Sequence, residues 1–245
     1  MSCLKLCSAL AIVLSALPMA AFAQDESGTT ESTTESTTEE ESKSPLSLSL
    51  AATTDYRFRG LSQTDIGPAF QIGATYTAPF GLYLGGWASN VEFGDADKEV
   101  DWFLGYNTDL GEAVNWDIQV YRYGYPGSSS ASFNEYITKF TFLKNYYVLE
   151  AYSNDAFGSS TDSWYTQLGV TVPLPSDFSV AGAVGMTEFE DGDVGRDYKD
   201  WSLSLSHPIG PATASVAYIG TDGKGRDAYG RIADSRFVFT ISLAL

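Results

Sequence analysis

The charged residues best placed to bind or select a solute occur at every second position of short apolar segments. Asp55, Arg57 and Arg59 alternate with Tyr56 and Phe58. Successive side chains of a β-strand point to opposite faces, so the charges would share one face and the rings the other. The same alternation adds further polar residues to that charged face: Glu99, Asp101, Asp117, Gln119, Glu135, Lys139 and Glu150. We expect these side chains to line the lumen of a closed sheet.

Two interpretations of these charges stay open at this point. Facing basic and acidic rows would set a field across a pore and select solutes by charge. Alternatively, the charges would pair across the lumen, be buried and fill it. A loop that folds back would also narrow the lumen, and the polar, glycine-rich segment 221–235 is the expected constriction.

Hydrolytic chemistry has little support in the sequence. The single histidine, His207, precedes Pro208 in a short connection, where a turn residue is the natural interpretation. A hydrolase of the Ser–His type needs its histidine within hydrogen-bond reach of a nucleophile. We therefore expect no enzyme, no catalytic residue and no cofactor.

Metal binding is a weaker possibility in two acidic loops, one around Asp95 and Asp97 and the other at 190–193. Oxygen-rich clusters suit calcium, but neither segment has the spacing of an EF-hand. The default interpretation is solvated loop charge that ions bridge to surface lipopolysaccharide.

The elements that position the charges are strands. Period-two alternation and turn residues predict about twelve of them, near residues 46–59, 69–78, 82–89, 99–107, 114–123, 133–142, 146–153, 162–172, 178–187, 198–206, 212–220 and 236–245. The connections between them are alternately long and short, as in outer-membrane barrels. The last segment places Phe237, Phe239, Ile241, Leu243 and Leu245 on one face. The expected fold is all-β, a transmembrane antiparallel up-and-down β-barrel, with a soluble sandwich as the alternative.

The start of the chain predicts export. Residues 1–23 combine Lys5, an apolar run and an Ala21-Phe22-Ala23 cleavage site, which together indicate a signal peptide. Residues 24–45 are acidic and rich in Ser, Thr and Glu, which predicts a disordered linker. The barrel is expected over residues 46–245. Both cysteines, at positions 3 and 7, fall within the signal, so no thiol chemistry is expected in the mature chain.

The net charge of the chain argues against nucleic acid as a partner. The chain has 14 Lys and Arg against 31 Asp and Glu, for a formal net charge of −17. Binding nucleic acid needs a basic footprint, so nucleic acid is not an expected partner.

The segment from Asp55 to Thr64, with sequence DYRFRGLSQT, resembles the opening of the TorF family of porins, outer-membrane barrels of the Gcw_chp type. Further similar stretches are GWASNVEFG at 86–94, EVD at 99–101, YGYPG at 123–127 and NEY at 134–136. The resemblance covers residues 46–245. It implies an outer-membrane barrel proposed to pass small solutes, without a catalytic motif. The acidic linker is not part of the family pattern.

The function expected from these features is passive diffusion of small hydrophilic solutes or ions through a narrow charged lumen in the cell outer membrane. The expected partners are outer-membrane lipid, lipopolysaccharide, the barrel-assembly machinery and the solutes themselves. The alternative is a non-conducting barrel that acts through its surface loops, in adhesion or envelope integrity.

Overall fold

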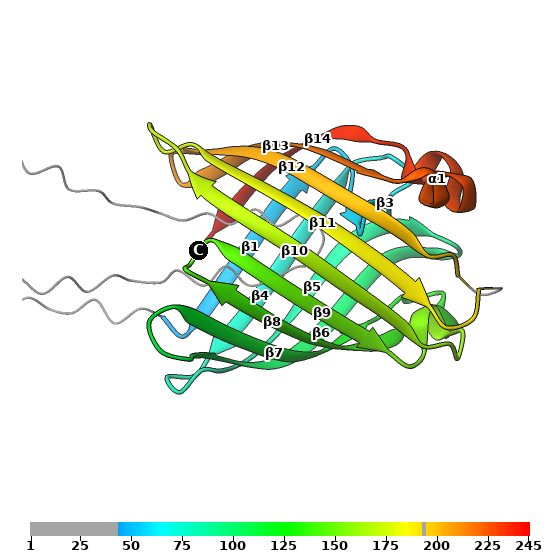
Figure 1. Ribbon diagram of the computed structural model, residues 1–245, viewed down its shortest axis with the longest axis horizontal. Helices are drawn as coiled ribbons and strands as arrows, with labels where there is room; N and C mark the ends of the chain where they lie inside the picture. Colours follow the sequence, from blue (N-terminus) through cyan, green and yellow to red (C-terminus); the bar gives the residue numbers. More distant parts are fainter. Residues whose placement is uncertain (1–43, 193–194) are drawn as a thin grey trace, which may run out of the picture.

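A computed structural model describes residues 44–192 and 195–245 and shows a closed antiparallel barrel of twelve strands (Figure 1). Each strand pairs with its neighbours in the chain, and β1 closes the barrel by pairing with both β4 and β14. The barrel strands are β1 Leu46–Thr53, β4 Ala69–Thr77, β5 Leu82–Phe93, β6 Ala96–Asp109, β7 Val114–Tyr123, β8 Phe133–Phe142, β9 Tyr146–Ser153, β10 Ser163–Pro173, β11 Ser179–Phe189, β12 Tyr198–Ile209, β13 Ala212–Thr221 and β14 Arg236–Ala244. The predicted fold class and strand number are confirmed.

The two ends of the barrel differ in their connections. The end that carries the C-terminus has short turns, and we call it the turn end. The opposite end, the loop end, carries η1 Ser129–Ala131, η2 Ala156–Gly158, α1 Gly223–Tyr229 and η3 Gly230–Ala233. The expected long loop at 90–98 is mostly strand, because β5 and β6 continue to a turn at residues 94–95.

Among the residues that the structure describes, no helix has both the length and the apolar character needed to cross a bilayer.

Alternation along the strands gives the barrel an apolar outer surface. Large apolar side chains remain exposed at every second position of several strands, for example Leu48, Leu50, Ile72, Leu84 and Leu104. In a soluble sandwich such residues would be buried between two sheets. Here the outer surface stays uncovered, and the alternate residues point into the barrel.

The interior is asymmetric. Strands β5 to β9 point large side chains inward, and we call them the large wall: Tyr83, Trp87, Phe103, Tyr121, Tyr123, Phe133, Ile137, Tyr147 and Leu149 are all buried. Toward the turn end, strands β11 to β13 point small side chains inward, and we call this surface the small wall: Ser179, Ala181, Ala183, Ser202, Ser204, Ser206, Thr213, Ser215 and Ala217. Nearer the loop end, the same strands turn Tyr198, Asp200 and Ile219 inward, and all three are buried.

The first predicted strand is wrong in its second half. It was expected over residues 46–59, but β1 ends at Thr53 and the chain then turns into the barrel. The backbone of Arg59 and Gly60 has φ of 49° and 82°, in the left-handed region that a strand cannot contain. The charged residues of this segment therefore belong to a loop inside the barrel.

Candidate functional site: a loop inside the barrel

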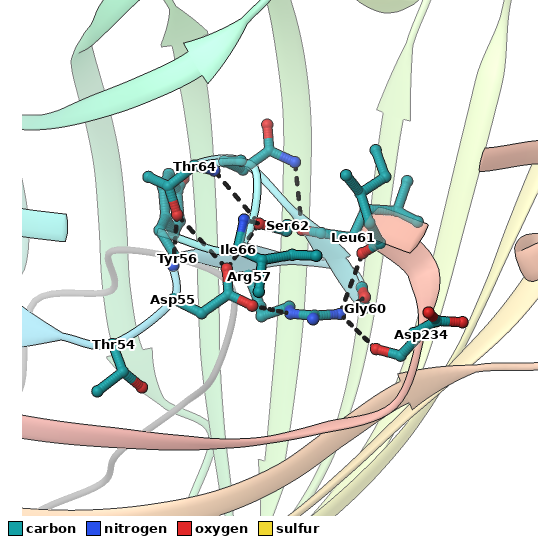
Figure 2. Close-up of polar contacts among 12 residues, drawn as sticks. Thr54, Asp55, Tyr56, Arg57, Gly60, Leu61, Ser62, Thr64, Ile66 and Asp234 are labelled. Atoms are coloured by element: carbon teal, nitrogen blue, oxygen red, sulfur yellow. Dashed lines mark hydrogen bonds and ion pairs between the residues drawn. The ribbon is translucent and has the colours of Figure 1, made fainter. Parts of the chain in front are cut away.

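The candidate site is built around residues 54–68, which we call the inner loop. The loop contains two short paired strands, β2 Arg57–Phe58 and β3 Leu61–Ser62. Most of its side chains are buried, including those of Asp55, Arg57 and Arg59. Figure 2 shows its polar residues turned toward one another within the barrel. The stretch from Asp55 to Thr64 is thus the segment that enters the lumen.

Asp55 organises the fold of the inner loop. Its carboxylate accepts hydrogen bonds from Arg57 Nε at 2.7 Å and from Ser62 Oγ at 2.6 Å. Thr64 Oγ1 accepts a bond from the backbone N–H of Tyr56 at 3.2 Å and donates one to the carbonyl of Gly67 at 2.6 Å. These bonds stabilise the reversal of the chain between Asp55 and Gly67.

Arg57 joins the inner loop to residues 222–235, which we call the β13–β14 loop. Its Nη1 donates to the carbonyl oxygens of Gly60 at 2.8 Å and Asp234 at 3.0 Å (Figure 2). It also donates to the carbonyl oxygen of Ile232 at 3.1 Å. Asp65 and Arg231 form an ion pair between the same two loops. The segment expected to constrict the lumen therefore contacts the inner loop, while the inner loop itself occupies the interior.

Arg59 reaches the strands of the barrel. Its Nη2 lies 2.8 Å from Glu135 Oε2 on β8, and both side chains are buried. The guanidinium also lies over the Tyr165 ring on β10, 4.1 Å from its centroid, and over the Phe58 ring at 4.6 Å. Tyr123 donates a second hydrogen bond to Glu135 Oε2 at 3.1 Å. One guanidinium is thus held by a carboxylate and two aromatic faces.

Aromatic rings of the inner loop pack on the large wall. The centroids of Tyr56 and Trp87 are 5.4 Å apart, and those of Phe58 and Tyr123 are 5.6 Å apart in an edge-on arrangement. Both separations fall in the range of favourable ring pairs. The loop is therefore seated on the large wall by its rings and by the Arg59–Glu135 pair, and Arg59 also contacts Tyr165 on β10.

Glu99 and Asp101 are buried on neighbouring inward positions of β6. Glu99 accepts a hydrogen bond from the Tyr125 hydroxyl at 3.3 Å, and Asp101 accepts one from the backbone N–H of Gly124 at 3.2 Å. Tyr125 lies beyond the end of β7, and burial followed by the charge of Glu99 raises the pKa of its phenol well above the ordinary value. Tyr125 consequently stays a hydrogen-bond donor to this acidic pair.

Nearer the turn end, Asp117 faces Lys139 across the β7–β8 pair. Asp117 accepts hydrogen bonds from Tyr83 Oη at 2.8 Å and from Asn107 Nδ2 at 3.1 Å. Lys139 lies over the ring of Tyr147 at 4.7 Å. Gln119 is buried beside Asp117 on the same face of β7.

Glu150 is the expected lumen residue that the structure places elsewhere. The inward positions of β9 are Tyr147, Leu149 and Ala151, so Glu150 points outward, where it accepts a hydrogen bond from Thr166 at 2.8 Å. The expectation was wrong because YYVLEAYS is apolar at both parities. When apolar residues stand at both odd and even positions, the alternation of apolar and polar residues does not show which face of the strand points inward.

The expected residues did not include Asp200, which is buried on β12 and accepts a hydrogen bond from Tyr165 Oη at 3.2 Å. Asp200 continues the inward series of Ser202, Ser204 and Ser206, so alternation would have identified it. Its second oxygen, Oδ2, has no hydrogen-bond partner among the described residues.

The buried charges divide unequally between the strands and the inner loop. Among the described residues, the strands bury five carboxylates and one ammonium group: Glu99, Asp101, Asp117, Glu135, Asp200 and Lys139. The inner loop buries two guanidinium groups and one carboxylate, those of Arg57, Arg59 and Asp55. The strands therefore form an acidic interior, and the inner loop places two guanidinium groups inside it. In the same part of the chain, no group of three or more His, Cys, Asp or Glu side chains is placed to hold a metal ion.

Comparison with solved structures finds barrels of the same architecture. The NanC porin has a TM-score of 0.54 and 13% sequence identity, with 81% of this chain and 98% of that chain covered. The KdgM porin, in a structure described as a complex with disordered oligogalacturonate, has a TM-score of 0.53 and 7% identity, with 80% and 98% covered. At these identities the likeness shows the fold. No curated protein matches the sequence. A family profile described as "Bacterial protein of unknown function (Gcw_chp)" matches residues 37–244.

Proposed function

Since this chain belongs to the Gcw_chp family, we propose from its own geometry that it is an outer-membrane channel for small hydrophilic solutes or ions, narrowed by the inner loop. The apolar outer surface would face lipid, and the loop end would face the cell exterior. Lipid, lipopolysaccharide and the barrel-assembly machinery are the partners that this location requires. The predicted signal peptide and linker lie almost wholly outside the described residues, and export remains part of the proposal.

The observation that carries the proposal is the asymmetry of the interior. A barrel of twelve strands encloses more space than a barrel of eight strands, whose interior is just filled by side chains. The large wall occupies one side of that space, and the inner loop reaches across it near the loop end, where Gly60 lies against Thr221 and Asp200. Toward the turn end, the small wall leaves the other side lined by short, mostly hydroxylated side chains. At the turn end, Ser47 and Ser49 lie on the inward face of β1 and are exposed. A polar path along the small wall is therefore the proposed route.

Single-channel recording of the refolded protein in a planar bilayer tests this function. Stepwise conductance under a salt gradient is expected, and the reversal potential reports which ion passes. A heat-modifiable, folded barrel that gives no steps in any salt would contradict the proposal.

The seating of the inner loop favours a second candidate, a barrel closed to solutes that acts through its loops. Arg59, Glu135 and the aromatic pairs bridge the lumen. Under this alternative, variants that loosen the inner loop would also fail to conduct.

A further inference from the structure

We propose that the channel selects small organic cations with a guanidinium or ammonium group, and that Arg59 occupies the site where such a cation binds. This inference rests on the proposed function and names its solute class. In this view the guanidinium of Arg59 occupies the cation site when no solute is bound. The inner loop moves away from the site, a solute cation binds in place of the guanidinium, and the loop returns after the cation has passed.

The surroundings of Arg59 describe what that site recognises. Glu135 supplies a carboxylate at 2.8 Å, and Tyr165 supplies an aromatic face at 4.1 Å. Both belong to the barrel strands, so they remain when the loop moves. A carboxylate beside an aromatic face is the combination that binds guanidinium and ammonium groups, through a charge-assisted hydrogen bond and a cation–π contact. Tyr123 keeps Glu135 in place through its own hydrogen bond.

Charge balance gives the second argument. Once the inner loop is removed, the described strands retain two inward cations, the buried Lys139 and the half-buried Arg236, against five buried carboxylates. Among these, Glu135 would lose its ion-pair partner, and Asp200 Oδ2 has no hydrogen-bond partner in the described part of the chain. A buried carboxylate without a cation is costly, so the vacated interior favours cations and disfavours anionic solutes.

The backbone of the inner loop does little to hold the loop in its observed position. Its backbone takes the left-handed conformation at Arg59, Asp65 and Ile66, which non-glycine residues rarely adopt. Two paired strands of two residues each provide little regular hydrogen bonding. Side-chain contacts therefore hold the loop in place, and these are the contacts for which a solute cation can compete.

Chemical rescue tests the site without requiring conductance. The variant Arg59→Ala, refolded in detergent as the full mature chain, keeps Glu135 and Tyr165 and removes the guanidinium. Calorimetric titration with ethylguanidinium should show binding to this variant and none to the parent, whose site is occupied. In the double variant Arg59→Ala/Glu135→Gln, binding should weaken at least about tenfold, as expected for loss of a hydrogen bond to a charged group. N-ethylurea, a neutral analogue of similar shape, should not bind.

Ion selectivity supplies the second readout. Arg59→Ala should conduct cations in preference to chloride more strongly than the parent, and Glu135→Gln in the same background should reduce that preference. Channels that conduct without preferring cations, together with no ethylguanidinium binding, would overturn the inferred site and leave the proposed channel standing. Ethylguanidinium binding to a barrel that never conducts would support the site and contradict the channel. Equal binding of ethylguanidinium and N-ethylurea would overturn the inference, because the charge would then have no role.

Discussion

The guanidinium of Arg59 and the carboxylate of Glu135 are 2.8 Å apart inside the barrel, with side chains only 5% and 1% exposed. Arg59 belongs to the inner loop and Glu135 to β8, 76 residues later. Burying an ion pair gains little net stability, because desolvating both charges offsets their attraction. Removing one partner is costly, however, since it leaves the other charge unpaired. The pair therefore acts mainly to fix where the inner loop sits.

Arg57→Lys should loosen the inner loop. Arg57 bonds the Asp55 carboxylate through Nε and three carbonyl oxygens through Nη1, and an ammonium group cannot reproduce that planar arrangement. We expect faster proteolytic cleavage within residues 54–68 and more frequent large conductance steps. Arg122→Lys is the matched control, because Arg122 is exposed and its hydrogen bond to Asn134 is 3.3 Å long. Equal cleavage rates in the two variants would show that Arg57 does not hold the loop.

Gly60→Ala should prevent the inner loop from closing. A Cβ at Gly60 would lie 2.7 Å from Thr221 Cγ2 and 2.9 Å from Asp200 Cβ, in addition to the strain of φ +82°. Gly111→Ala separates the steric clash from the backbone strain, because Gly111 has φ +83° and a Cβ built there would have no atom within 4 Å. Both variants should lose about 1–2 kcal/mol from backbone strain, measured by urea unfolding. Gly60→Ala alone should raise conductance, and parental conductance in this variant would contradict the tight packing.

Glu150→Gln should leave ion selectivity unchanged, whereas Glu135→Gln should change it. Glu150 points outward from β9 beside Thr166, and Glu135 points inward beside Arg59. The two substitutions are chemically identical and remove one negative charge each. Reversal potentials under a salt gradient measure the difference. A shift for Glu150→Gln as large as that for Glu135→Gln would mean that the assigned faces are wrong.

Alternation in the sequence was enough to predict the strands, since most of their bounds agree with the structure to within a few residues. It failed at Asp55–Arg59 because a polar–aromatic alternation also suits a loop whose rings pack on the rings of the barrel while Arg59 pairs with a buried carboxylate. The conformation of this segment depends on contacts with Glu135, Trp87 and Ile232, which are distant from it in the sequence. Period-two reasoning considers only neighbours along one strand, so it could not detect those contacts.

The last prediction concerns the link between the inner loop and the β13–β14 loop. Asp65 and Arg231 pair across it near the loop end, and Arg57 bonds the backbone of the same segment. If the inner loop must move for solutes to pass, then tethering it should hold the channel in its low-conductance state. The variant Asp65→Cys/Arg231→Cys, joined by a short thiol-reactive cross-linker, tests this. The chain's two cysteines lie within the predicted signal peptide, so mature protein would carry only the engineered pair.

Cross-linked channels should lose the large conductance steps, and cleavage of a reducible linker should restore them. Each single cysteine variant, treated with the same reagent, controls for modification without a tether. Large steps that persist in fully cross-linked protein would show that solutes pass along the small wall while the inner loop stays in place. In that case Arg59 would be a permanent part of the channel lining, and its charge would repel cations instead of yielding its site to them.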